Sequence, residues 1–484
     1  MGFPRSFLRL RAIVTALSLI ALFWWISQGS RDFYLEQSPP ISDGIKGSQD
    51  LTSHTGFWRQ FEPLLMRYGP NCPSPKRLTN ARTVGYKVTD PELRPEVLEM
   101  SMDDVTQMKN AHSGFVSSIA SNPPKLHYIP GTRGLVSTAG GAYLPVLVIS
   151  LRMLRRTGST LPMEVFLANR DEYEEYICDE VLPSLNAKCL VLSEILDSVP
   201  NTKEIKKYQF KPFAMIFSSF EEILFLDADA FPIAKPEQLF VTEPFRSKKM
   251  VTWPDFWASS TSPIYYEISS QEVPPMELRQ STESGEVMIS KKTHLRTLLL
   301  CTYYNFWGPT HYYPLFSQGA AGEGDKETFT TAATAVGEPF YQVSEPICAI
   351  GHGTKGGLAG SAMVQFDPAD DYTLTQKGEW RIRGSSAPSP RAFFVHANFP
   401  KFNPATVFTK QSVNPAFNDD GSYTRAWTIP DEVINAFGSD VEKHFWEEIM
   451  WTGCELEDKF QSWKGQLGIC DDVKKYWNAM FAAE

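Results

Sequence analysis

Two aspartates one residue apart follow a short apolar run near the middle of the chain. The run covers residues 223–226 and is followed by Asp227, Ala228 and Asp229. In an extended chain, residues i and i+2 point to the same side, so the two carboxylates converge. Carboxylates that converge repel each other unless a cation or a proton lies between them. The pair therefore predicts a cation site, although solvated acids that cap a strand would share this pattern.

Three other segments carry polar groups that could meet this pair. GEGDKETF places Asp325 and Glu327 at an expected helix start, where the helix dipole also favours acids. FFVHANFPKFNP places His396 at the end of an apolar run, with Lys401 five residues later. A lone histidine in that place would also suit a hydrogen-bonded core. The glycine-rich residues 130–143 could contact a phosphate through backbone N–H groups, but they match neither the dinucleotide nor the Walker fingerprint.

The elements that must position these residues alternate between strand and helix from residue 123 onward. Strands are expected at KLHYI, GLVST, MEVFLA, AKCLVL, EILFLDADA, KKMVTW, GEVMIS and AFFVHA. Alternation with helical segments predicts an α/β fold with a parallel sheet and right-handed crossovers. Ligands of such sheets collect at the carboxyl ends of the strands, where Asp227 and Asp229 lie.

The overall composition limits the partners of the protein. Of the 484 residues, 42% are hydrophobic and 13% are aromatic, which is ample for a sizeable core. The formal net charge of -10 argues against nucleic acid as a partner, because domains that bind nucleic acid are usually basic.

The N-terminus predicts a membrane anchor. Three arginines precede an uncharged apolar run over residues 12–26, and two tryptophans near its end suit a membrane interface. The basic flank places the N-terminal side in the cytosol and the bulk of the chain in the lumen. A cleaved signal peptide is the alternative. The expected organisation is a cytosolic tail (1–11), a signal-anchor transmembrane helix (12–26), a flexible stem (27–55), an N-terminal extension of unknown role (56–122) and a catalytic domain (123–484).

The cysteines then lie in an oxidising compartment, where disulfides form. Cys178 with Cys189 and Cys454 with Cys470 are candidate local bridges. The sequence has seven cysteines, so at least one thiol stays unpaired or forms an intermolecular bond.

Five longer motifs occur in order between residues 125 and 405. They are GLVSTAGGAYLPVLVISLRMLRRTGSTLPMEVF, QFKPFAMIFSSFEEILFLDADAFPI, ESGEVMISKKTH, YYPLFSQGAAGEGDKETF and HANFPKFNP. Together they resemble the fungal Golgi α-1,3-mannosyltransferase family. The resemblance implies a GT-A-type nucleotide-sugar-binding fold, with a mixed, mainly parallel sheet flanked by helices. It also implies GDP-mannose as donor, a glycan acceptor, Mn²⁺ (or Mg²⁺) as cofactor, retention of the anomeric configuration and a lumenal catalytic domain at the Golgi membrane.

The chemistry of this family gives the candidate residues their roles. A divalent ion held by carboxylates neutralises the charge of a leaving diphosphate, and one imidazole ligand favours Mn²⁺. The expected metal ligands are Asp227, Asp229 and His396. The expected substrate-binding residues are Arg133, Asp227, Glu283, Ser284, Gly285 and Lys401, and the expected catalytic residues are Asp325 and Glu327.

Three other functions remain open at this point. The donor could be UDP-glucose or UDP-GlcNAc. A haloacid-dehalogenase-type phosphatase also uses Asp-x-Asp after a strand, but that strand comes early in its domain, whereas several strands and helices precede it here. An inactive lumenal glycan-binding protein is the third alternative.

The anchor hypothesis is tested by fractionation of membranes. We expect the protein to stay in the membrane pellet after carbonate extraction, and its bulk to resist protease in intact microsomes, because residues 12–26 are uncharged. A soluble, secreted protein whose mature chain begins near residue 30 would contradict the hypothesis.

Overall fold

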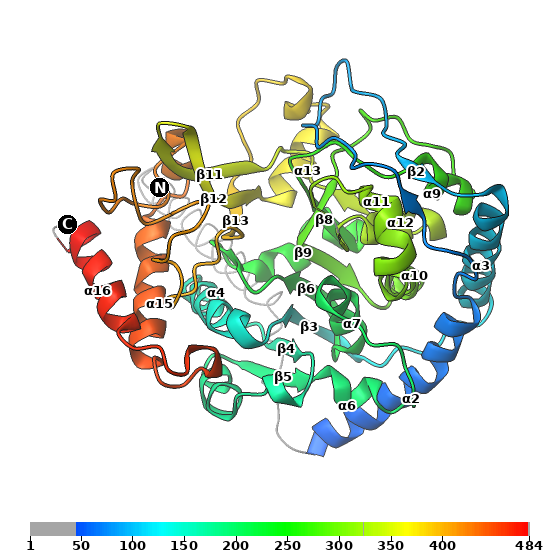
Figure 1. Ribbon diagram of the computed structural model, residues 1–484, viewed down its shortest axis with the longest axis horizontal. Helices are drawn as coiled ribbons and strands as arrows, with labels where there is room; N and C mark the ends of the chain where they lie inside the picture. The colour runs from blue at the N-terminus through cyan, green and yellow to red at the C-terminus, as the bar shows by residue number, and fades with distance from the viewer. Residues whose placement is uncertain (1–44, 323, 483–484) are drawn as a thin grey trace, which may run out of the picture. The chain divides into compact units, whose positions relative to one another are not determined.

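The computed structural model describes residues 45–322 and 324–482 (Figure 1). The chain divides into residues 1–40 and a larger unit from residue 41, and only the larger unit contains described residues. The expected tail and anchor lie outside them. No helix within the described ranges is both long and apolar enough to cross a membrane.

The central layer is a mixed, seven-stranded sheet with the order β10-β8-β9-β6-β3-β4-β5. Strand β9 is antiparallel to both of its neighbours, and all other pairs in this sheet are parallel. The expected mixed, mainly parallel sheet flanked by helices is therefore confirmed. Its strands are β3 (Ile129–Thr138), β4 (Met163–Leu167), β5 (Ala187–Val191), β6 (Phe220–Leu226), β8 (Met250–Pro254), β9 (Thr282–Ser290) and β10 (Tyr341–Gln342).

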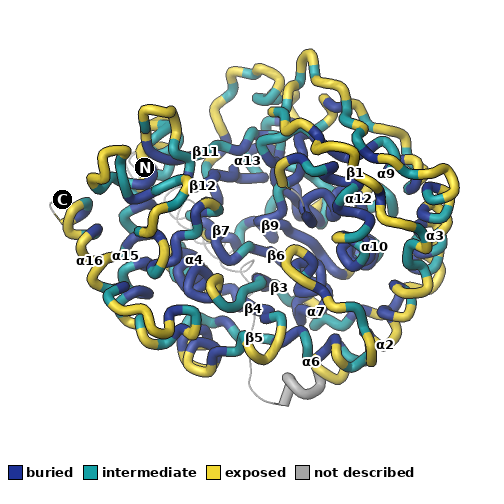
Figure 2. Tube along the Cα trace, viewed as in Figure 1, coloured by how far each residue is buried: buried dark blue, intermediate teal, exposed yellow. Residues whose placement is uncertain are grey.

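Both faces of this sheet are buried, which explains the continuous apolar run of β6. Ile223 and Phe225 pack into one core, whereas Leu224 and Leu226 pack into a second core on the other face. Figure 2 shows the strands buried at the centre and the exposed residues concentrated at the periphery. The first core is covered by helices α2 (Ile45–Arg67), α3 (Met102–Ser121), α7 (Phe210–Phe217), α10 (Leu295–Phe306) and α12 (Thr328–Val336), and the second by α4 (Leu144–Arg156).

The N-terminal extension belongs to this folded unit. Phe61 of α2 and Phe115 of α3 are fully buried in the first core. Trp58 of α2 also donates a hydrogen bond from Nε1 to the carbonyl oxygen of Leu196, at 3.0 Å. The stem expected over residues 27–55 overlaps α2, so its last part is helical because this helix has an apolar face to bury.

A second, four-stranded antiparallel sheet has the order β11-β12-β13-β7. Helices α15 (Val441–Glu455) and α16 (Ile469–Met480) pack beside it in a third core (Figure 1). The chain leaves the first sheet at the end of β6 and enters the second at β7, so residues 227–229 join the two. The strands are β7 (Ala230–Pro232), β11 (Cys348–Thr354), β12 (Gly357–Phe366) and β13 (Ala392–His396).

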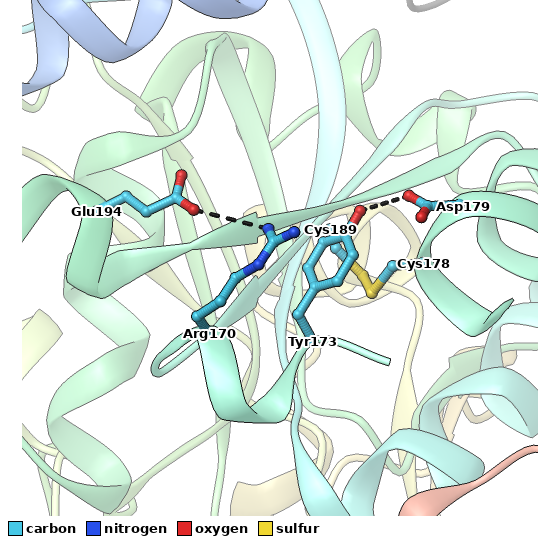
Figure 3. The surroundings of a disulfide bond; sticks show 6 residues. All are labelled: Arg170, Tyr173, Cys178, Asp179, Cys189 and Glu194. Carbon is cyan, nitrogen blue, oxygen red and sulfur yellow. Dashed lines mark hydrogen bonds and ion pairs between the residues drawn. A yellow bond between two sulfur atoms is a disulfide. The ribbon is translucent and has the colours of Figure 1, made fainter. Parts of the chain in front are cut away.

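Both expected disulfides are confirmed. Cys178 is bonded to Cys189 and ties a π-helical turn (Ile177–Val181) to β5, as Figure 3 shows. Cys454 is bonded to Cys470 and ties α15 to α16. All seven cysteines lie in the described ranges, and the other three are free thiols: Cys72, Cys301 and Cys348.

Candidate functional site

The two aspartates lie in a tight turn between the two sheets. The backbone N–H of Asp227 donates to the carbonyl of Gly285 in β9, at 2.8 Å, and that of Ala230 donates to the carbonyl of Asp227, at 3.0 Å. The N–H of Ala397 donates to the carbonyl of Asp229, at 2.9 Å. These bonds hold the turn to β9 on one side and to the end of β13 on the other.

His396 lies beside this turn because it pairs with Ala230 in the register between β13 and β7. Its Nε2 lies 3.1 Å from Oδ1 of Asp229, and its Nδ1 lies 3.8 Å from Oε1 of Glu283, beyond hydrogen-bond range. The ring is 5% exposed. Burial alone would lower the pKa of His396, but the carboxylates of Asp229 and Glu283 outweigh it and raise that pKa well above its usual value.

Lys401 contacts the second oxygen of Asp229. Burial would raise the pKa of Asp229, but the charges of His396 and Lys401 outweigh it and hold the pKa below its ordinary value. The Lys401 side chain is 36% exposed, and its Nζ lies 5.7 Å from the centre of the Tyr143 ring. It is therefore a cation at the rim of the site, where we expected it.

Lys211 is a site residue that the sequence did not reveal. From α7 its Nζ donates to the carbonyl of Ser284 at 2.6 Å and to the Ser284 hydroxyl at 3.0 Å, and it lies 3.2 Å from Asp227. Asp325 is 3.4 Å away. Burial would lower the pKa of Lys211, but Asp227 and Asp325 raise it above its ordinary value. The only sequence signal is a single lysine in the otherwise apolar helix FKPFAMIF.

The segment at the start of β9 lies against the site and contains Glu283, Ser284 and Gly285, whose predicted contact with substrate stays a prediction. The Ser284 hydroxyl donates to Oδ2 of Asp325 at 3.0 Å, and the Gly285 N–H donates to Oε2 of Glu283 at 2.6 Å. A Cβ atom at Gly285 would lie 2.6 Å from Cε1 and Nδ1 of His396, so only glycine fits there. The structure thus brings Asp325 and this segment to the aspartate turn.

Glu286 is a second residue that sequence reasoning missed. It is fully buried on β9, and neither carboxylate oxygen has a hydrogen-bond partner within the described ranges. Burial and the nearby charge of Glu283 raise its pKa well above the ordinary value. The pattern Glu-Ser-Gly-Glu offered a signal, because residue 286 follows three residues that we had assigned to the site.

Two predicted residues lie elsewhere. Glu327 accepts hydrogen bonds from the Ser281 hydroxyl at 2.7 Å and the Thr282 N–H at 2.9 Å, so it anchors the start of β9 rather than joining the aspartates. Arg133 forms an ion pair with Glu222, with 2.8 Å between Nε and Oε2. Glu222 precedes Asp227 by five residues in the sequence. At ~3.3 Å per residue, that position lies roughly 15 Å from the carboxyl edge of the sheet. Only residues 130–138 of the glycine-rich segment lie in strand β3, so Arg133 is held in the sheet, whereas residues 139–143 form the turn between β3 and α4.

The expected metal ligands fit a divalent cation. Ligand atoms of Asp227, Asp229 and His396 all lie within 4.8 Å of one another. Two carboxylates with one imidazole suit Mn²⁺, and Mg²⁺ accepts the oxygen ligands. On binding an ion, His396 would give up its contact with Asp229 and coordinate the ion instead. One oxygen of each aspartate would likewise leave its present partner and coordinate the ion.

Comparisons with known proteins agree on one family. The mannosyltransferase family model Mannosyl_trans3 matches residues 132–279 and 275–367. The chain is 33% identical over 472 residues to the α-1,2-mannosyltransferase MNN21 of Candida albicans, covering 84% of this chain and 70% of that protein. It is 34% identical over 418 residues to the α-1,2-mannosyltransferase MNN2 of Saccharomyces cerevisiae, covering 72% and 69%.

The chain spans only part of its relatives. It covers 60% of the length of the α-1,2-mannosyltransferase MNN24 of Candida albicans, with 34% identity over 433 residues and 74% of this chain matched. Among solved structures, the galactosyltransferase LgtC matches 63% of this chain and 95% of its own, with 11% identity and a TM-score of 0.34. The linkage in the relatives' names is α-1,2, whereas the motif resemblance implied α-1,3.

The buried charge balance makes a prediction about Lys211. Lys211→Met should lower the free energy of unfolding by about 3 kcal/mol, because it leaves Asp227 and Asp325 buried without their cation. Lys249→Met is the matched control, since it removes a lysine from an ion pair with Glu222. The Lys249 side chain is 29% exposed, so its loss should lower the free energy of unfolding by under about 1 kcal/mol.

Chemical denaturation with and without Mn²⁺ provides the measurement. Mn²⁺ should restore more stability to Lys211→Met than to the unchanged protein, because the ion supplies positive charge at Asp227, one of the two carboxylates that lose their cation. Equal losses in the two variants, with no added effect of Mn²⁺, would show that Lys211 does not balance the aspartate turn.

Proposed function

Because this chain belongs to the fungal mannosyltransferase family, we propose that it transfers mannose from GDP-mannose to a glycan acceptor through an α-1,2 linkage. Membership of the family makes the chain a glycosyltransferase and sets aside the phosphatase and the inactive binding protein. The observation that carries the proposal is the cluster of Asp227, Asp229 and His396 at the carboxyl edge of the sheet, with ligand atoms within 4.8 Å of one another. The linkage and the donor are taken from the relatives' names and the motif resemblance.

The site has the charges that departure of a nucleoside diphosphate requires. A divalent cation bound by Asp227, Asp229 and His396 would neutralise charge that develops on the leaving diphosphate. Lys401 is the part of the site that can reach a phosphate directly, because it is partly exposed while its Nζ is held by Asp229. Asp229 thereby orients two groups at once, the imidazole of His396 and the ammonium of Lys401.

The part of the site around Asp325 would hold the transferred sugar. Asp325 is buried there, and Ser284 and Lys211 fix the direction of its carboxylate. A carboxylate held in this way accepts hydrogen bonds from sugar hydroxyls with little loss of side-chain freedom. We assign Asp325 to the transferred mannose or to the acceptor hydroxyl, with retention of the anomeric configuration as the motif resemblance implies.

The cellular setting is part of the proposal. The two disulfides suit an oxidising compartment. An N-terminal anchor with a lumenal catalytic domain at the Golgi membrane would place the enzyme where a glycoprotein acceptor passes. The fractionation described above tests this part separately from the chemistry.

The donor and the linkage are tested on the purified full-length chain. In the presence of Mn²⁺ we expect calorimetry to show tighter binding of GDP than of UDP, and mannose transfer that stops when the metal is chelated. Methylation analysis of the product should find a newly 2-substituted mannose. A preference for UDP would overturn the assignment of GDP-mannose as donor. A 3-substituted mannose in the product would show that the linkage is α-1,3 instead of α-1,2.

Asp229→Asn tests the role of the aspartate turn. The change keeps the shape but removes the charge that faces His396, Lys401 and the ion, so the rate should fall at least ~10²-fold. Asp458→Asn is the control, because that carboxylate is 78% exposed on the surface, and its rate should not change.

The variant should also lose some stability, because the buried His396 and the partly exposed Lys401 both lose their counter-charge. Relief of repulsion between the aspartates, which the sequence alone would suggest, is outweighed by these contacts. Rates are therefore compared per folded molecule. Full activity and unchanged Mn²⁺ dependence in folded Asp229→Asn would show that Asp227 and Asp229 only cap the strand and have no role in the reaction.

A further inference from the structure

A separate cavity of about 370 Å³ lies beside the site, and no residue of the aspartate turn or of its imidazole lines it. Its volume falls in the range of ~300–1,000 Å³ that is typical of small-molecule sites. Its walls come from parts of the chain that are far apart in sequence, including α9 (Pro263–Ile268), α12, β10 and the segment before β9. Leu278 at its rim is 56% exposed, so the cavity opens to solvent.

The lining combines aromatic rings with neutral polar groups. The rings belong to Tyr86, Tyr265, Tyr266, Phe340, Tyr341 and Trp380. Trp380 and Tyr86 are half-buried, and the guanidinium carbon of Arg383, another lining residue, lies 4.9 Å from the centre of the Trp380 ring. Amide side chains of Gln280 and Gln342 line the same cavity. Sugars suit this lining, because their C–H faces stack on aromatic rings.

The lining carries Arg279, Arg383 and Glu272, and Arg279 is paired with Glu327 outside the lining, so no excess positive charge favours a phosphate over a neutral ligand. Arg279 is one cation in the wall, but its Nη2 lies 3.6 Å from the carboxylate of Glu327. Its Nη1 donates to Gln342 Oε1 at 3.1 Å and to the Thr282 hydroxyl at 3.2 Å. Glu272 adds a carboxylate to the lining. Arg279 is thus a rigid part of the wall rather than an anion receptor.

Two short segments connect this cavity to the aspartate site. Gln280 lines the cavity and Glu283 lies in the site, three residues further along, so their Cα atoms are at most roughly 11 Å apart. On the other side, Glu327 faces Arg279, and Asp325, two residues earlier, accepts from Ser284 in the site. This explains the position of Glu327, which holds the two places together.

We propose that this cavity is a subsite for the acceptor, and that it holds a sugar residue of a neutral mannose oligosaccharide close to the residue that receives the new mannose. The assignment rests on the proposed mannosyltransferase function. It predicts that the enzyme prefers oligosaccharides to single sugars as acceptors, because only a longer acceptor fills both places.

The test uses the purified full-length chain with mannopentaose and with methyl α-mannoside as probes. Trp380→Ala should weaken mannopentaose binding about tenfold, because it removes an aromatic ring from the lining, and it should leave the affinity for methyl α-mannoside within about twofold. Trp380→Phe keeps a ring and should lie between the two. Tyr176→Ala is the matched control, because Tyr176 is an aromatic residue that is 47% exposed and does not line the cavity.

Titration calorimetry of each glycan, with GDP and Mn²⁺ titrated in parallel, separates the two hypotheses. Unchanged mannopentaose binding in folded Trp380→Ala, or equal affinity of the unchanged protein for both glycans, would overturn the subsite. If Trp380→Ala does not fold, Trp380→Phe is used in its place. An affinity of Trp380→Phe for mannopentaose equal to that of the unchanged protein would then overturn the subsite. Failure of the unchanged protein to bind GDP would instead contradict the proposed donor, whatever the glycan titration gives.

Discussion

The structure depends on how it buries several carboxylates in one small space. Asp229 and Asp325 are almost fully buried, and Asp227 lies beside them. Charges of one sign can share such a place only if opposite charges lie among them. Lys211 of α7 supplies one positive charge, and Lys401 at the rim of the site supplies another.

This balance is built from elements of two different sheets. Asp227 ends a strand of the large sheet, whereas His396 ends a strand of the small one, and the turn of residues 227–229 joins both. The site is therefore formed only when the sheets have packed together. Gly285 shows how close they come, since its missing side chain leaves the space that the His396 ring fills.

Much of this could be predicted from the sequence, and the failures have physical reasons. The apolar runs of β6 and β13 pointed to Asp227 and Asp229 after the first and to His396 and Lys401 after the second, because polar residues at strand ends leave a clear pattern. Lys211 left only the weak signal of one lysine in an apolar helix, since its partners come from segments that fold against α7 only in three dimensions. Glu286 had a signal in the Glu-Ser-Gly-Glu pattern, but it lies inside a strand that reads as core.

The incorrect predictions came from features that serve two purposes. The glycine-rich residues 130–143 predicted a phosphate loop, but residues 129–138 form a strand that holds Arg133 in the sheet, and only residues 139–143 form the turn before α4. KLHYI was expected to form a strand of its own, yet only Ile129 of it belongs to β3. Acids at a helix start can face a site or fix the backbone: Asp325 contacts Ser284 and Lys211 in the site, whereas Glu327 accepts from Ser281 and Thr282 at the start of β9.

Helices α2 and α3 have a practical consequence for the boundaries of the enzyme. Sequence alone placed the catalytic domain from residue 123, but Phe61 and Phe115 lie in the core that covers the sheet. A truncated protein that starts at residue 123 would expose this large apolar face to water, and such faces drive aggregation. Helices α2 and α3, which precede the first strand of the large sheet, thus cover the core. The smallest soluble form of the enzyme must include them.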